Sequence, residues 1–233
     1  MSFELSLNQN EEEGGRMRVM MAGATGLVGG SFFRRAVGDS GIEQIVLLGR
    51  RAVSEFESHD KVTSLVADFN ALDSLAPSCR VDVMVCALGT TLKKAGSKER
   101  LFEVDCLYTE AAAAYGLRCG ARTLVVISSV GASATASSHY LRTKGEMEKR
   151  VTALGYAACH ILRPSLLMGD RGETRFGESL AARLLSPVSF LLPAAYRPVH
   201  ADTVAETIHS VIKEPGEGVR VYGGKEIQVT GNR

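Results

Sequence analysis

Residues 18–29 read RVMMAGATGLVG, an apolar run that leads directly into three evenly spaced glycines, Gly23, Gly26 and Gly29. The run 18–22 is typical of a buried parallel strand, and the residues from Leu27 onward are typical of a helix. In such a unit Gly23 permits a tight turn, Gly26 lets backbone amides approach a pyrophosphate, and Gly29 lets the helix pack closely on the strand. The helix N-terminus then faces the phosphates with its partial positive charge. The stretch predicts a dinucleotide-binding fold with these cofactor contacts: Gly23, Thr25, Gly26, Leu27, Val28 and Gly29.

Strand-like and helix-like stretches alternate along the rest of the chain, which predicts a parallel sheet with helices on both faces. The expected strands are 18–22, 44–48, 62–66, 81–86, 123–127 and 157–162, and the expected helices are 27–37, 97–115, 138–154, 178–185 and 203–213. We therefore expect a single α/β domain over residues 17–233, a doubly wound parallel sheet. The polar residues 1–16 are expected to form a flexible tail.

The pattern turns irregular and rich in proline after Arg163, so we expect a small C-terminal cap on the substrate side over about residues 163–200. Its large apolar side chains are candidates for a pocket wall, for ordinary core or for a dimer contact: Phe176, Phe190, Leu191 and Leu192.

Composition excludes several classes of protein. The 233 residues include 27 basic and 26 acidic side chains, without the basic stripe that nucleic-acid binding needs. No apolar stretch is long enough to span a membrane. The five cysteines are scattered and the five histidines show no metal-ligand spacing, so we expect neither disulfides nor a metal site. Free thiols fit a reducing compartment, and we expect a cytoplasmic protein that acts on a small molecule and could form a homodimer.

The residues after the second expected strand favour NADP(H) over NAD(H). An NAD-selective site has a carboxylate about 20 residues after the glycines, whereas this chain has Arg50 and Arg51 there. Two guanidinium groups suit a 2′-phosphate; the alternative is a pair of solvated surface arginines. Further cofactor contacts are expected where the third and fourth strands end, at Asp68, Ala87, Leu88 and Gly89. Asp68 has the alternative of being an ordinary loop residue.

A serine, a tyrosine and a lysine are candidates for the chemistry. Tyr140 and Lys144 are four residues apart, hence on one helix face, and Ser128-Ser129 end the fifth expected strand. Ser129 would hydrogen-bond a reacting carbonyl, Tyr140 would pass a proton, and Lys144 would favour the phenolate, because a tyrosine ordinarily titrates near pH 10. Two alternatives stay open: a plain surface pair at 140 and 144, and Ser128 in place of Ser129. For the small polar residues 131–138 the alternative is a plain mobile loop.

Together these residues resemble the short-chain dehydrogenase/reductase superfamily over about Met17 to Lys213. The runs CALGTT (86–91), KAG (94–96) and LRPSLL (162–167), with Asp170, Arg171 and Glu173, are similar to its atypical branch of Tat-interacting oxidoreductase-like proteins and bacterial NAD(P)H-binding relatives. The resemblance implies a Rossmann fold, NADPH as cofactor, catalytic positions at Ser129, Tyr140 and Lys144, and Arg163-Pro164 beside the nicotinamide. Where the family often has an asparagine, this chain has Asp105.

The sequence thus predicts an NADPH-dependent oxidoreductase that reduces a small carbonyl or similar unsaturated substrate. One alternative is an NADPH-binding regulatory or sensor protein with little turnover. A third reading is an epimerase that keeps its cofactor and returns the hydride to its substrate.

Overall fold

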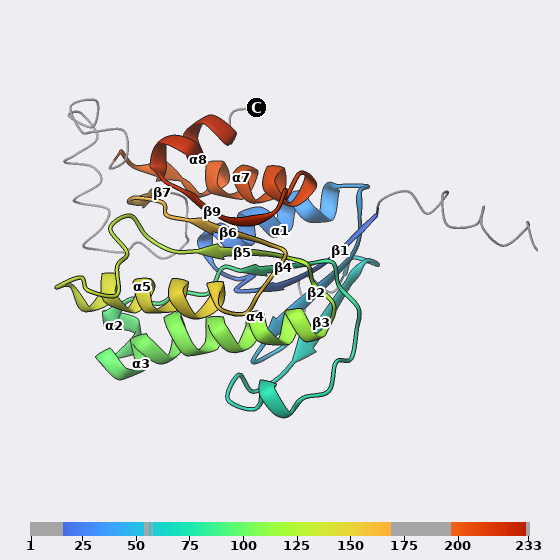
Figure 1. The fold of residues 1–233 in the computed structure, drawn as a ribbon. Helices are drawn as coiled ribbons and strands as arrows, with labels where there is room; N and C mark the ends of the chain where they lie inside the picture. The colour runs from blue at the N-terminus through green and yellow to red at the C-terminus, as the bar shows by residue number, and fades with distance from the viewer. Residues whose placement is uncertain (1–15, 54–55, 57, 169–196, 232–233) are drawn as a thin grey trace, which may run out of the picture.

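Seven strands form one sheet in which every neighbouring pair is parallel, in the order β3-β2-β1-β4-β5-β6-β9 (Figure 1). The computed structural model describes residues 16–53, 56, 58–168 and 197–231. The strands are β1 (Met17–Ala22), β2 (Ile42–Gly49), β3 (Val62–Val66), β4 (Val83–Cys86), β5 (Thr123–Ile127), β6 (Ala158–Leu162) and β9 (Gly218–Tyr222). The order reverses between β1 and β4, as in doubly wound sheets that bind ligands at that point. The predicted Rossmann-like parallel sheet is confirmed.

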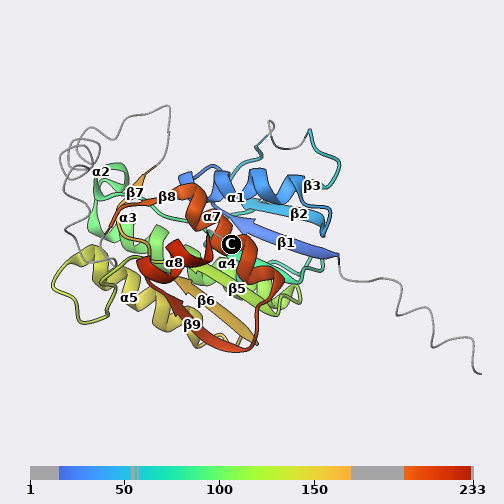
Figure 2. The same ribbon diagram turned by 90° about the horizontal axis from the view of Figure 1, so that it is seen from above.

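Helices cover both faces of this sheet (Figures 1 and 2). One face carries α1 (Leu27–Gly38), α7 (Ala201–Lys213) and α8 (Gly224–Thr230), and the other carries α3 (Lys98–Phe102), α4 (Tyr108–Arg118) and α5 (His139–Thr152). Short elements complete the described chain: a 3-10 turn (Leu72–Ser74), α2 (Leu92–Ala95) and the paired strands β7 (Leu167–Met168) and β8 (Val199–His200). No helix among the described residues is long and apolar enough to cross a membrane.

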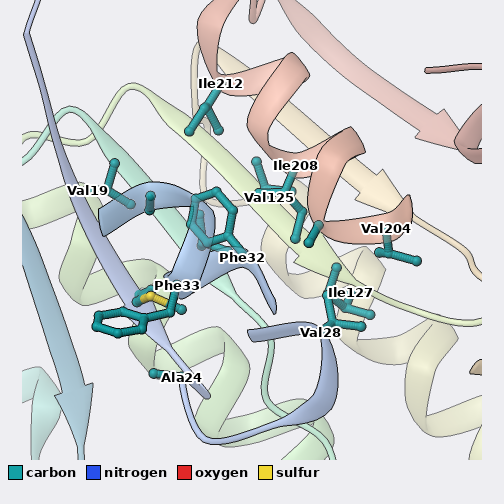
Figure 3. Packing of buried hydrophobic residues seen from close by; sticks show 14 of the residues in the cluster. Val19, Ala24, Val28, Phe32, Phe33, Val125, Ile127, Val204, Ile208 and Ile212 are labelled. Atoms are coloured by element: carbon teal, nitrogen blue, oxygen red, sulfur yellow. The ribbon is translucent and has the colours of Figure 1, made fainter. Parts of the chain in front are cut away.

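Each face of the sheet has its own apolar core. On the α1 and α7 side, Phe32 and Ile208 pack with Val125 of β5 (Figure 3). On the α4 and α5 side, Tyr115 and Met147 are fully buried against the same sheet. Because both faces are covered, β5 is apolar and buried at nearly every position, which is why it could be read from the sequence.

Two parts of the chain differ from the sequence prediction. The single helix expected over 97–115 is interrupted by a π-helical turn, Glu103–Leu107, between α3 and α4. The strand β9 and helix α8 were not expected, so the irregular pattern after Arg163 gives way again to regular structure that completes the sheet. The expected helix 178–185, the residues Phe176, Phe190, Leu191 and Leu192, and residues 1–15 of the expected tail lie outside the described residues.

Candidate functional site

The glycine loop between β1 and α1 is shaped by backbone contacts that only glycine permits. Gly23 has φ of +92°, and a Cβ placed on it would lie 2.5 Å from the Ala87 carbonyl oxygen. A Cβ on Gly29 would lie 2.1 Å from the Gly23 carbonyl oxygen. No side chain caps α1 at Gly26, so its first-turn amides are left for water or a ligand.

A cleft of about 470 Å³ opens beside this loop, at the carboxyl ends of the strands. Its walls come from the loops after β1, β4, β5 and β6, from the start of α5 and from the π-helical turn. Of the residues expected from the sequence, the cleft brings together Gly26, Leu27, Val28, Ala87, Leu88, Gly89, Ser128, Ser129, Tyr140 and Lys144. Gly23, Thr25, Gly29, Arg50, Arg51, Asp68, Arg163 and Pro164 do not line it.

Lys144 is held by a buried ion pair. Its Nζ lies 2.9 Å from Asp105 Oδ1 and donates to the Ile127 carbonyl at 3.2 Å, and both charged side chains are almost completely buried. Burial works against the charge of the lysine, but the carboxylate of Asp105, together with Tyr140, outweighs it and raises the pKa of Lys144. Lys144 is therefore an ammonium at neutral pH. Tyr140, one turn earlier, is 38% exposed and lines the same cleft.

The two serines at the end of β5 have different surroundings. Ser128 is buried, and its Oγ donates a hydrogen bond to Glu148. Ser129 is half-buried, and its Oγ makes only a long 3.4 Å bond to the Val130 carbonyl among the described contacts. The hydroxyl of Ser129 is thus the one that faces the cleft without a strong partner.

Arg163 forms an ion pair with Glu148 and does not line the cleft. Its Nε and Nη2 donate to the two carboxylate oxygens of Glu148, at 2.9 and 2.5 Å, and this pairing raises the pKa of Arg163. Pro164 is buried and accepts a backbone bond from Val130. The expectation that Arg163 and Pro164 line the nicotinamide side stays a prediction, since neither residue lines the cleft. The fork-shaped guanidinium of Arg163 pairs with a carboxylate of α5 and so ties β6 to the helix that carries Tyr140 and Lys144.

The residues expected at the adenosine end lie outside the cleft and are exposed. Arg50 and Arg51 follow β2, on the surface. The Arg100 guanidinium and, more weakly, Arg50 hold the pKa of Glu103 below its usual value, which places Arg50 within electrostatic reach of the π-helical turn. Asp68 accepts from the backbone and side-chain amides of Asn70, at 3.0 and 3.2 Å, so it closes a local turn.

Several residues of the site were given no role from the sequence. The cleft is also lined by Thr90, Thr91, Asp105, Ile127, Val130, Ser165, Leu166 and Leu167. Most of them directly follow a strand end that was recognised, so extending each loop by two or three residues would have found them. Glu148 had a signal of another kind, because it lies one helical turn after Lys144. Among the described residues no three potential ligands stand close enough to hold a metal ion.

Curated relatives resemble this chain along most of its length. Protein HTATIP2 of Rattus norvegicus is 33% identical over 202 residues, 86% of this chain and 83% of that protein. Protein FMP52 of Saccharomyces cerevisiae is 31% identical over 221 residues, 91% of this chain and 95% of that protein. The chain belongs to the HTATIP2 and FMP52 family of atypical short-chain dehydrogenase/reductase proteins. No protein-family model matches the sequence.

Solved structures of the same superfamily share the fold. DesIV, a dTDP-glucose 4,6-dehydratase of Streptomyces venezuelae, superimposes with a TM-score of 0.67 over 93% of this chain and 80% of its own, at 17% identity. A short-chain dehydrogenase/reductase family oxidoreductase of Burkholderia thailandensis gives 0.63, covering 90% and 92% of the two chains, at 18% identity.

The family corrects one expectation. Its fungal members, among them those of Saccharomyces cerevisiae and Candida albicans, are named as mitochondrial proteins, which contradicts the predicted cytoplasmic location. That prediction rested on free cysteines, and free thiols indicate a reducing compartment without saying which one.

Proposed function

We propose that this protein is an NADP(H)-dependent oxidoreductase that reduces a small carbonyl or similar unsaturated substrate. The observation that carries the proposal is the meeting of Ser129, Tyr140 and Lys144 in one cleft beside the glycine loop. Residues from four separate loops and a helix converge there, which a plain surface pair at 140 and 144 would not require. Membership of the HTATIP2 and FMP52 family supports the same class of activity.

The residues present fit a nicotinamide dinucleotide. The glycine loop keeps a tight turn that a Cβ on Gly23 or Gly29 would break by collision with the backbone, and uncapped amides at the start of α1 suit a pyrophosphate. The structural neighbour DesIV was solved with NAD bound, which supports this class of cofactor. When bound, such a cofactor supplies the hydride.

The side chains of the protein would supply binding and proton transfer. Ser129 Oγ donates to the substrate oxygen and orients it, and the Tyr140 hydroxyl gives its proton to that oxygen as hydride arrives at carbon. The Lys144 ammonium lies one helical turn from Tyr140 and stabilises the negative charge that the proton transfer leaves behind. The surrounding apolar residues, such as Leu88 and Ile127, limit the access of water.

Replacing Tyr140 by Phe tests the proposal. The purified protein is first titrated with NADPH by cofactor fluorescence and then screened for NADPH oxidation against carbonyl compounds. The variant should lose turnover by about 10²- to 10⁴-fold because the proton donor is gone, while its affinity for NADPH changes little. Unchanged turnover would refute the mechanism. Binding without turnover of any substrate would favour a sensor, and failure to bind either NADPH or NADH would refute the proposal.

A further inference from the structure

Asp105 is a buried carboxylate on an unusual piece of backbone. It lies in the π-helical turn Glu103–Leu107 and is fully buried, at the wall of the cleft. Single π-helical turns occur frequently at functional sites, and carboxylates are almost never fully buried unless they are paired. The proton transfer described above makes no use of this side chain.

Both oxygens of Asp105 are engaged by groups of the cleft wall. Oδ1 forms the 2.9 Å ion pair with Lys144, and Oδ2 accepts from the Thr90 backbone amide at 2.8 Å. The carboxylate therefore fixes the position of the lysine relative to the loop that follows β4. It also cancels the charge of the lysine, so that the pair as a whole is neutral.

Among the described residues, Tyr140 and the thiols of Cys86 and Cys106 are the other titratable groups that interact with Lys144. Burial raises the pKa of both thiols, in Cys106 to about 12. These thiols carry no charge near neutral pH. Replacing Asp105 by the neutral asparagine often found in the family removes the carboxylate that offsets burial, which lowers the pKa of Lys144. Below that lowered pKa the wall carries the uncompensated charge of Lys144.

We propose that Asp105 determines which oxidation state of the cofactor the protein holds more tightly. The oxidised nicotinamide ring carries one positive charge and the reduced ring carries none. The neutral pair of Asp105 and Lys144 tolerates the cationic ring, whereas an unpaired lysine would repel it and leave the affinity for the reduced form nearly unchanged. The inference rests on the proposed function, because it requires that a nicotinamide cofactor binds in this cleft.

Equilibrium binding of both cofactor forms tests the inference without any turnover. Wild-type protein and Asp105→Asn are titrated with NADPH by its fluorescence, and with NADP⁺ by competition, at pH values from about 7 down to about 5.5, because a buried lysine without its carboxylate partner loses its proton more readily than an exposed one. At the low end of this range the ratio of the two dissociation constants, oxidised over reduced, should be about tenfold higher in the variant than in wild type, as expected for one unit charge roughly 10 Å away at an effective dielectric constant near 20. Asp73→Asn makes the same change in charge on a side chain that is 86% exposed, and should leave the ratio as it is.

A second variant separates electrostatics from folding. Lys144→Met removes the positive partner and leaves the carboxylate, so the ratio should move in the opposite direction and the oxidised form should gain affinity relative to the reduced one. A purely structural role of Asp105 predicts equal weakening of both forms in Asp105→Asn and no reversal in Lys144→Met. Either result would overturn the inference, whereas a wild-type protein that binds neither form would refute the proposed function instead.

Discussion

At the scale of single residues, the two arginines that we propose to select NADP(H) over NAD(H) lie outside the cleft. Arg50 and Arg51 are exposed and follow β2, the position at which an NAD-selective site carries its carboxylate. A 2′-phosphate bound there would meet two guanidinium groups, both of which are exposed to solvent. The proposed preference for NADPH over NADH should therefore depend on these two residues.

Replacing both Arg50 and Arg51 by Ala should weaken NADPH binding and leave NADH binding nearly unchanged. Each charge-assisted hydrogen bond contributes about 1.5–3 kcal/mol, so the preference for NADPH should fall at least tenfold for each hydrogen bond removed. Fluorescence titration of wild type and double variant with both cofactors measures it. Arg122→Ala, which removes an arginine at the opposite end of the sheet, is a suitable control. An equal loss of affinity for both cofactors would contradict the assignment.

At the scale of elements, α5 is positioned by one glycine as well as by its ion pairs. Gly145 follows Lys144 directly, and a Cβ on it would lie 2.1 Å from the Ser133 carbonyl carbon and 2.3 Å from the Ala134 nitrogen. The loop 131–138 thus crosses α5 at backbone contact distance. This contact packs the backbone of the loop against the helix that carries Tyr140 and Lys144. A loop that is simply mobile, the alternative left open by the sequence, would not need such a contact.

Gly145→Ala should therefore destabilise the protein, although alanine normally favours a helix by about 0.5–1 kcal/mol over glycine. The forced shift of backbone should lower the free energy of unfolding by about 1–3 kcal/mol. Gly38→Ala is the matched control, because Gly38 ends α1 and a Cβ there meets nothing within 4 Å. Urea unfolding of both variants provides the comparison. A Gly145→Ala protein as stable as wild type would show that the loop yields without cost.

The elements that the sequence could and could not predict differ in a physical way. Strands β1, β2, β4, β5 and β6 were recognised because burial on both faces makes them largely apolar, and β5 agrees with the prediction to the residue. The edge strand β3 also agrees to the residue, although it is only partly buried. Strand β9 was missed because it has no buried residue, with Val219 and Val221 about half exposed and Arg220 between them, and because it follows the irregular stretch after Arg163. The π-helical turn could not be seen either, since one extra residue in a helical turn leaves no mark on composition.

The candidate site shows the same division. Residues set by local backbone geometry, such as Gly23 and Gly29, were recognised from their spacing. Residues joined by long-range contacts were not: the bond of Ser128 to Glu148, and that of Glu148 to Arg163, depend on how α5 packs over β5 and β6. The pairing of Arg163 with Glu148 was therefore not predicted, because an arginine at a strand end gives no sign of which carboxylate it will meet.

At the scale of the whole molecule, the last strand, β9, is joined to β6 by a hydrogen bond to a buried histidine. His160 of β6 is fully buried, and its Nδ1 lies 3.0 Å from the Tyr222 hydroxyl of β9. Burial and the nearby charge of Arg220 lower the pKa of His160 below its ordinary 6.5, and a backbone contact with Pro215 only partly offsets them. The folded protein thus holds this imidazole neutral where the unfolded chain would protonate it.

This difference predicts a loss of stability in mild acid. Above pH 6.5 the imidazole is neutral in both states, whereas below it the unfolded chain takes up a proton that the folded protein resists, so the free energy of unfolding falls as the pH decreases towards the lowered folded pKa. Urea unfolding at about pH 7.5 and about pH 5.5 measures the slope. His160→Asn keeps an acceptor for Tyr222 and removes the titration, so this variant should be less stable at both pH values but lose less between them. A slope equal to that of wild type would assign the acid sensitivity to other groups and show that β9 is docked independently of the charge on His160.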